Sequence, residues 1–126
     1  MSICLAAGAL VISLGAGEIT LAWRHSVQKS LWEEVWRETP DGLVIAEARV
    51  QGSGAGMEPP PEARLVDGLW RWRPQLPPLK EVVMRRSGAT ADWRVCVGAK
   101  CRTMNALLPA EADPVVMRPC AGAQPG

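Results

Sequence analysis

The sequence contains no phenylalanine and no tyrosine, and it has a single histidine, His25. Six tryptophans supply all the aromatic rings, so a hydrophobic core has to be built from tryptophan, valine, leucine, isoleucine and alanine. A buried indole N–H needs a hydrogen-bond acceptor. We therefore expect polar acceptors close to the tryptophan rings.

The sequence also has almost no net charge, +1 over 126 residues. Nucleic-acid binding by counterion release needs a basic surface, and so does adsorption to anionic lipid. Neither class of partner fits this composition, so we expect no nucleic acid and look instead to small molecules and other proteins. The length fits one domain with one core.

No charged residue occurs before Glu18. Glycines interrupt this apolar stretch, which is shorter than the roughly 20 residues that a spanning helix needs, and it has no positive region of the kind that opens a signal peptide. We expect two short strands, 3–7 and 9–14, no transmembrane span and a cytoplasmic protein. The alternative is an uncleaved anchor or a misassigned start codon.

Most of the remaining chain alternates apolar and polar residues between turn signals, which is typical of short strands. The segment 29–39 fits a helix or a strand, and the Pro40-Asp41-Gly42 turn after it favours a strand. The predicted fold is an all-β antiparallel sandwich or partly open barrel built from a meander. It occupies residues 1–108, followed by a flexible tail from 109 to 126. Beyond the first two, the predicted strands are 18–27, 29–39, 42–51, 63–66, 69–73, 79–87, 92–97 and 100–104.

The stretch from Trp23 to Trp36 holds the histidine and two adjacent carboxylates. On a strand, His25 shares the face of Trp23, while Ser26 lies on the other face. Glu33 and Glu34 also point to opposite faces, so at most one of them accompanies His25. This stretch is predicted to be the centre of the sheet first and a binding surface second.

A glycine-rich loop follows, and it lacks the Gly-x-x-x-x-Gly-Lys-Ser/Thr pattern of a phosphate cradle. A tryptophan-rich sheet beside such a loop provides apolar walls and a few polar anchors for a ligand. The alternative is that all six tryptophans lie in the core and the polar residues are solvated. The candidate binding residues are His25, Ser26, Glu33, Glu34, Gly52, Ser53, Gly54, Gly56 and Met57.

A small hydrolase using His25 with Ser53 or Ser26 is the alternative function. The loop does not match Gly-x-Ser-x-Gly, and a lone histidine is more often structural. We therefore expect a protein that is not an enzyme, with no catalytic residue, no cofactor and no metal.

Cys96 and Cys101 stand at the two ends of a tight predicted hairpin, where cross-strand neighbours lie close enough for a disulfide after a modest adjustment. Such a bridge implies an oxidising compartment, so the periplasm is the alternative location. Cys4 and Cys120 are isolated and terminal, and a four-thiolate zinc site is not favoured.

These residues together resemble the bacterial domain-of-unknown-function family 1850. The resemblance rests on Trp23 with His25-Ser26-Val27, Trp32-Glu33-Glu34 with Trp36, the loop from Gly52 to Pro60, and Asp92-Trp93 followed by Cys96 and Cys101. Gln28 stands where members usually have an acid. The resemblance implies a small β-rich domain, often encoded beside TRAP-type transporters, so a TRAP permease or its solute receptor is the implied partner. No activity follows from it.

Overall fold

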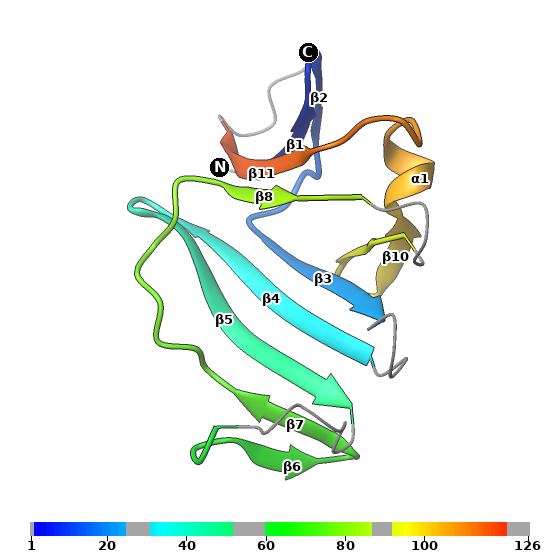
Figure 1. Ribbon diagram of the computed structural model, residues 1–126. Helices are drawn as coiled ribbons and strands as arrows, with labels where there is room; N and C mark the ends of the chain where they lie inside the picture. Colours follow the sequence, from blue (N-terminus) through cyan, green and yellow to red (C-terminus); the bar gives the residue numbers. More distant parts are fainter. Residues whose placement is uncertain (1, 25–30, 52–59, 87–91, 121–126) are drawn as a thin grey trace.

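The structure, a computed structural model, describes residues 2–24, 31–51, 60–86 and 92–120, and within them the chain forms eleven strands and one short helix (Figure 1). Almost every element is a strand, as the alternating sequence predicts. The elements are β1 (Ser2–Ala7), β2 (Leu10–Ser13), β3 (Glu18–Arg24), β4 (Leu31–Thr39), β5 (Gly42–Gln51), β6 (Arg64–Val66), β7 (Leu69–Trp72), β8 (Val82–Met84), β9 (Arg94–Val97), β10 (Lys100–Thr103), α1 (Met104–Leu107) and β11 (Val115–Cys120).

Two antiparallel sheets make up the fold, which confirms the predicted all-β sandwich. The small sheet has the strand order β2-β1-β11-β8, and the large sheet has the order β10-β9-β3-β4-β5-β7-β6. The large sheet ends at β10 and at β6, so within the described residues it does not close into a barrel. The helix α1 has four residues, and in the described part of the chain no helix is long and apolar enough to cross a membrane.

The segment that fits either helix or strand forms the long strand β4, in the centre of the large sheet. Its register with β3 places Trp32 opposite Trp23 and Glu34 opposite Leu21. The turn to β5 requires glycine, because Gly42 has a φ of +129° and a Cβ there would lie 2.6 Å from the carbonyl oxygen of Leu79. The glycine in the turn and the alternation of side chains along the two strands thus together fix the register of the β4–β5 hairpin.

The C-terminal segment differs from the expected flexible tail. The strand β11 lies between β1 and β8, and the side chains of Val115 and Met117 are fully buried. Its partner β1 is at the other end of the chain, so the short apolar run at the start of β11 gave no hint of this pairing. Residues 121–126 are outside the described part.

The predicted strand 79–87 is shorter in the structure. Only Val82–Met84 forms β8, while Leu79 makes a single bridge to Leu43 of β5. Pro77 and Pro78 precede this region, and proline cannot donate to a strand ladder.

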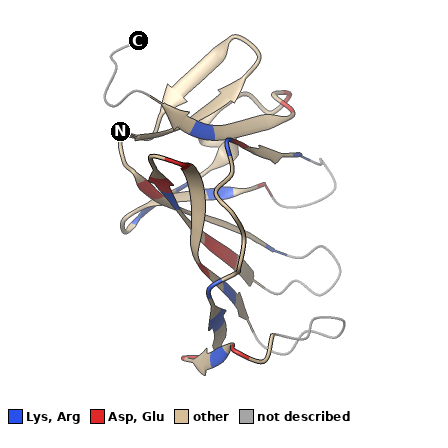
Figure 2. Cartoon of the chain, turned by 90° about the vertical axis from the view of Figure 1, so that its left-hand side faces the viewer, with Lys and Arg blue, Asp and Glu red and all other residues tan. Residues whose placement is uncertain are grey.

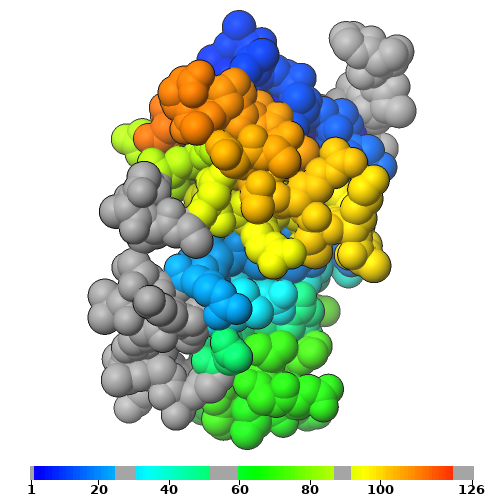
Figure 3. Space-filling model, turned by 90° about the vertical axis from the view of Figure 1, so that its right-hand side faces the viewer, coloured from blue at the N-terminus to red at the C-terminus, as the bar shows by residue number. Residues whose placement is uncertain are grey.

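The core lies between the small sheet and one half of the large sheet. Ile3 and Leu5 of β1 pack in one cluster with Ile19 and Leu21 of β3, and Met104 of α1 joins this cluster. Figure 3 shows the blue N-terminal strands and the orange segment after α1 together at one end of the molecule, with the green β6 and β7 at the other. The β6–β7 end of the large sheet therefore extends beyond the small sheet (Figure 1).

Candidate functional site

Three tryptophans cluster on the face of the large sheet that is directed toward the small sheet. They are Trp23 in β3, Trp32 in β4 and Trp93 just before β9. The rings of Trp23 and Trp32 stack, with centroids 5.9 Å apart and an interplanar angle of 19°. The ring of Trp93 lies 4.9 Å from that of Trp23 in a tilted arrangement. Such offset and tilted pairs are the favoured geometries of aromatic rings.

Trp70 and Trp72 of β7 continue this face. They are the cross-strand partners of Val50 and Ala48 in β5, and directly paired residues present their side chains on the same face. All five rings are half-buried, whereas the sixth tryptophan, Trp36, is buried in the core. We call the half-buried set, with Glu34, the tryptophan surface: Trp23, Trp32, Trp70, Trp72, Trp93 and Glu34.

Glu34 is the charged residue of this surface. Its carboxylate oxygen Oε1 accepts a hydrogen bond from Trp36 Nε1 at 3.1 Å. Burial raises the pKa of Glu34 above its ordinary value, and the hydrogen bond from Trp36 acts in the opposite direction. Within the described residues, no lysine or arginine pairs with Glu34.

Two of the six indoles have an acceptor in the described part of the chain, as predicted. Besides the bond from Trp36 to Glu34, Trp93 Nε1 donates to the carbonyl oxygen of Arg85 at 2.9 Å. Trp32 departs from the prediction: its Nε1 is buried and finds no hydrogen-bond partner among the described residues. A buried N–H without a partner is unfavourable for folding.

Glu33 lies on the opposite face, as alternation along the strand predicts. There Arg49 Nε donates to Glu33 Oε1 at 2.9 Å, and Arg49 also bonds Glu47 at 2.8 Å. Arg71 reaches Glu47 at 3.4 Å, which extends the network across β4, β5 and β7. Figure 2 shows both acidic (red) and basic (blue) residues on the strands of the large sheet. Glu33 is therefore paired with Arg49 on the opposite face. Of the two adjacent glutamates, only Glu34 belongs to the tryptophan surface.

The other predicted binding residues, His25, Ser26, Gly52, Ser53, Gly54, Gly56 and Met57, lie outside the described residues. The strand ends that flank them lie side by side: Arg24 is the cross-strand partner of Leu31, and the Leu31 N–H donates to Gln51 Oε1 at 3.2 Å. The predicted proximity of the histidine and the glycine-rich loop is therefore compatible with the sheet, and it stays a prediction, as does the hydrolase alternative.

Sequence reasoning missed Arg86, which joins both sheets through a buried guanidinium. Its Nε and Nη2 donate to the two carboxylate oxygens of Asp92 at 3.2 and 3.0 Å, and its Nη1 donates to the carbonyls of Pro109 and Ala112. Asp92 belongs to the Asp-Trp signature, and this geometry gives it a structural role. Sequence patterns do not identify Arg86, because its contacts lie outside one strand: Asp92 is 6 residues away, and Pro109 and Ala112 are 23 and 26 residues away.

All four cysteines form disulfides. The predicted Cys96–Cys101 bridge is confirmed and joins directly paired residues of β9 and β10. The Cys4–Cys120 bridge was not predicted; it ties β1 to β11 across a sequence separation of 116. The even number of cysteines was the one signal for it. Within the described ranges, no group of three or more His, Cys, Asp or Glu residues could hold a metal ion.

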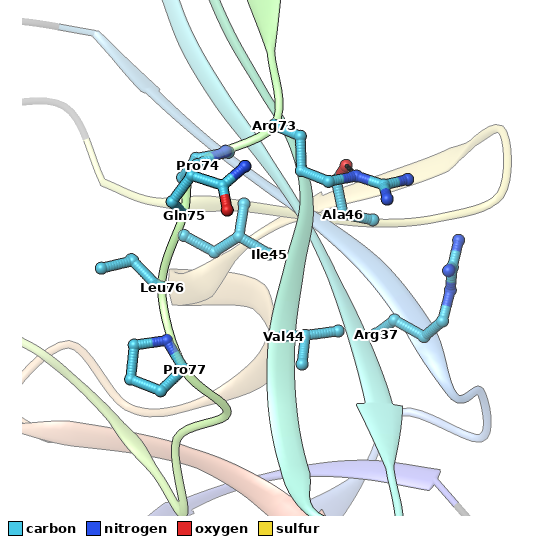
Figure 4. Close-up of a pocket in the computed structure, with 9 residues that line it drawn as sticks. All are labelled: Arg37, Val44, Ile45, Ala46, Arg73, Pro74, Gln75, Leu76 and Pro77. Atoms are coloured by element: carbon cyan, nitrogen blue, oxygen red, sulfur yellow. Dashed lines mark hydrogen bonds between the residues drawn. The ribbon is translucent and has the colours of Figure 1, made fainter.

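A hollow of about 470 Å³ lies on the other side of β5, beside the segment 73–77 (Figure 4). Figure 4 shows Arg37 and Arg73 on one side of β5 and Gln75 to Pro77 on the other. Arg37 is paired with Glu18 at 2.9 Å, and Arg73 Nε donates to the carbonyl of Ala46 at 3.4 Å. Both guanidiniums thus have partners within the protein, which makes this hollow a weaker anion site than its two arginines suggest.

Comparison with known proteins gives one match. The family model described as Domain of unknown function (DUF1850) matches residues 19–104, which run from β3 to the first residue of α1. No curated protein and no solved structure matches the sequence. The matched region contains the tryptophan surface and both Cys96 and Cys101, and it leaves out β1, β2 and β11 of the small sheet.

Proposed function

The chain belongs to the family described as Domain of unknown function (DUF1850), and we propose that it is a non-enzymatic accessory domain that binds a small molecule on its tryptophan surface. The observation that carries the proposal is Glu34, a desolvated carboxyl group without a cationic partner among the described residues, surrounded by half-buried indole rings. An unpaired buried carboxyl is unfavourable for folding, and such groups concentrate at functional sites.

The proposed ligand is a small organic cation, such as an amine. Tryptophan faces attract cations through the ring quadrupole, and a carboxylate provides the counter-charge. A neutral or anionic ligand would leave the Glu34 carboxylate uncompensated.

Binding of a cation reverses the effect of burial on Glu34. A positive charge next to the carboxyl lowers its pKa, so the complex favours the deprotonated form. Affinity is therefore expected to rise with pH as Glu34 loses its proton in the free protein. A ligand held by the tryptophan rings alone shows no such dependence.

The test is a titration of tryptophan fluorescence with a panel of amines, their neutral isosteres and carboxylates. We expect an amine to bind and Glu34→Gln to weaken it by about tenfold or more, the size of a lost charge-assisted contact. Glu33→Gln is the matched control, because this neighbour lies on the opposite face and its loss leaves the ligand site intact. Equal affinities for amines and isosteres, or equal losses in the two variants, contradict the proposal.

We further propose that the domain works beside a TRAP-type permease or its solute receptor. The family resemblance is the support for this partner. Co-purification of the tagged full chain with the neighbouring permease or receptor tests it. The absence of both from the purified material, with the tagged chain folded, counts against the transporter role and leaves the ligand proposal to its own titration.

The alternative function is hydrolysis by His25 with Ser53 or Ser26. The supporting observation is the contact between Leu31 and Gln51, which brings together the strand ends that flank these residues. Assays against ester and amide panels decide it. Activity that persists unchanged in His25→Ala, or no activity in the parent protein, removes this alternative.

A further inference from the structure

A second hollow, of about 260 Å³, lies over Ala22 at the other edge of the large sheet. The Cys96–Cys101 disulfide lines it together with four charged side chains, those of Arg24, Glu33, Asp92 and Arg94. The register places Cys96 and Arg94 opposite Thr20 and Ala22 of β3, on the face away from the small sheet. A disulfide is thus part of the wall of a solvent-filled hollow instead of the core.

A basic side chain lies beside this disulfide. Arg94 lines the hollow together with Cys96 and Cys101, whereas Lys100 and Arg102, the strand neighbours of Cys101, point to the opposite face of β10. The two carboxylates at the hollow already have partners, since Glu33 bonds Arg49 at 2.9 Å and Asp92 bonds Arg86 at 3.0 Å. Basic neighbours stabilise a thiolate and attract anions.

The two sulfur-bearing residues differ in access. Cys101 is exposed, whereas Cys96 has only 9% of its surface exposed. Thiol–disulfide exchange requires a thiolate to approach one sulfur, so access decides which sulfur is attacked. Here the approach is open at Cys101.

We propose that Cys96–Cys101 is a thiol–disulfide exchange site for small anionic thiols. The thiolate of the small molecule attacks Sγ of Cys101, a new S–S bond forms there, and the Cys96–Cys101 bond breaks with its electron pair leaving on Cys96. The product is a mixed disulfide at Cys101. A second thiolate then attacks the small-molecule sulfur, which releases the oxidised small-molecule disulfide and leaves Cys101 as a thiolate.

The Cys4–Cys120 disulfide is an internal reference in the same molecule. Cys4 is 3% exposed and lies in β1, which is paired on both sides by β2 and β11. Its strands must separate before a thiol can approach from the side of Cys4. The other sulfur belongs to Cys120, a half-buried residue at the end of β11, so exchange at this bridge is expected to be slower than exchange at the exposed Cys101.

The experiment treats the native full chain with reduced glutathione as the anionic thiol and with cysteamine as the cationic thiol. Samples are quenched with acid and alkylated, and each cysteine is quantified by peptide mass spectrometry. Each rate constant is divided by the rate of the same thiol with a neutral model disulfide, which removes intrinsic differences in thiol reactivity.

We expect the glutathione adduct at Cys101, with little at Cys96, and exchange there at least about tenfold faster than at Cys4–Cys120, as selective access requires. The normalised rate is expected to favour glutathione over cysteamine, and added salt should reduce this preference. The variant Arg94→Gln, which neutralises a basic side chain of the hollow, should reduce the preference and keep the adduct at Cys101. Arg118→Gln, a neutralised arginine on β11, is the matched control and should change nothing at Cys101.

Three results overturn the proposal. One is adduct formation mainly at Cys96, and another is exchange at both disulfides with one common rate, which indicates global unfolding. The third is an unchanged glutathione preference in Arg94→Gln while circular dichroism shows the native fold. That third result contradicts the role of the basic residue even if Cys101 is the sulfur attacked.

Discussion

The two ends of the large sheet are stabilised in different ways. At the end covered by the small sheet, Ile19, Leu21 and Leu43 are almost completely buried in a two-layer core. At the β6–β7 end the sheet is not part of that core: Leu65 is 57% exposed and Trp72 is half-buried. There the Arg49, Glu33, Glu47 and Arg71 network joins neighbouring strands instead.

The two ends of the large sheet therefore differ in what they contribute to stability and to ligand binding. Buried apolar area stabilises the covered end, whereas each ion pair at the other end is partly buried and contributes only about 1 kcal/mol or less. Regions with few buried apolar contacts are the ones that open locally and that carry ligand sites. The tryptophan surface spans the boundary, with Trp23 and Trp93 packed against the core and Trp32, Trp70 and Trp72 beyond it.

The largest effect is expected where a charged group is buried at the covered end. Arg86→Met removes a guanidinium that is 7% exposed and leaves Asp92 without its cationic partner. We expect the free energy of unfolding to fall by about 3–5 kcal/mol. Urea denaturation followed by tryptophan fluorescence measures it.

Arg37→Met is the control for this change. Its partner is Glu18, and both side chains are 52% exposed, so the loss is expected to be about 0–1 kcal/mol. Similar losses in the two variants would mean that Arg86 is not the link between the two sheets.

The second test compares matched leucines from the two ends. Leu5→Ala removes a fully buried side chain from β1 and should cost about 2–5 kcal/mol. Leu65→Ala, in β6, should change the unfolding free energy by no more than about 0.5 kcal/mol. A large loss for Leu65→Ala would show that the β6–β7 end has a core of its own.

Local patterns in the sequence identified much of the large sheet. The alternation in 42–51 gave β5 with both of its boundaries, and Asp67-Gly68 gave the β6–β7 hairpin. The alternation of side chains along a strand is enough to place Glu33 and Glu34 on opposite faces. This placement identifies Glu34 as the carboxylate of the candidate site.

In the small sheet, β1 and β2 agree with the predicted strands 3–7 and 9–14, whereas β11 was missed for a physical reason. Strand β11, the Cys4–Cys120 bridge and the bonds from Arg86 to Pro109 and Ala112 all pair segments that are distant in sequence, and a single sequence has no local signal for such pairing. The apolar run Val115-Val116-Met117 is too short to distinguish a central strand from a loop. The covered end therefore depends on long-range contacts, while the site depends on hairpins that local patterns reveal.

The third test uses the turn glycines of the two ends. Gly42→Ala places a methyl group 2.6 Å from the Leu79 carbonyl oxygen at a φ of +129°, so the backbone must shift. We expect a loss of about 2–3 kcal/mol. Gly68→Ala, at a φ of +80° with open space around it, should cost about 1 kcal/mol. Thermal denaturation of both variants gives the comparison, and a smaller loss for Gly42→Ala would exclude the close contact with Leu79.

The smallest change in unfolding free energy is expected from substitution of Glu33 or Glu34. The sign of the change should differ between these two residues, because they lie on opposite faces of β4. Burial raises the folded-state pKa of Glu34, whereas the unfolded chain keeps a value near 4.5. Below that value Glu34 is protonated in both states. As pH rises through the folded-state pKa, the folded protein must ionise a desolvated carboxyl, so the unfolding free energy falls. Glu34→Gln keeps an acceptor for Trp36 and removes this loss, so the variant should be more stable than the parent at neutral pH and nearly equal to it in acid.

Glu33→Gln is expected to have the opposite sign at neutral pH, because it removes the carboxylate that accepts from Arg49. The pair is partly buried, and its loss should lower the unfolding free energy by about 1 kcal/mol. Unfolding free energies of the parent and both variants, measured from pH 4 to pH 8 in urea, provide the comparison. If Glu34→Gln also destabilises the protein at neutral pH, the Glu34 carboxylate has a cationic partner in the folded chain. The tryptophan surface would then be a structural site, and the expected preference for organic cations would be lost with it.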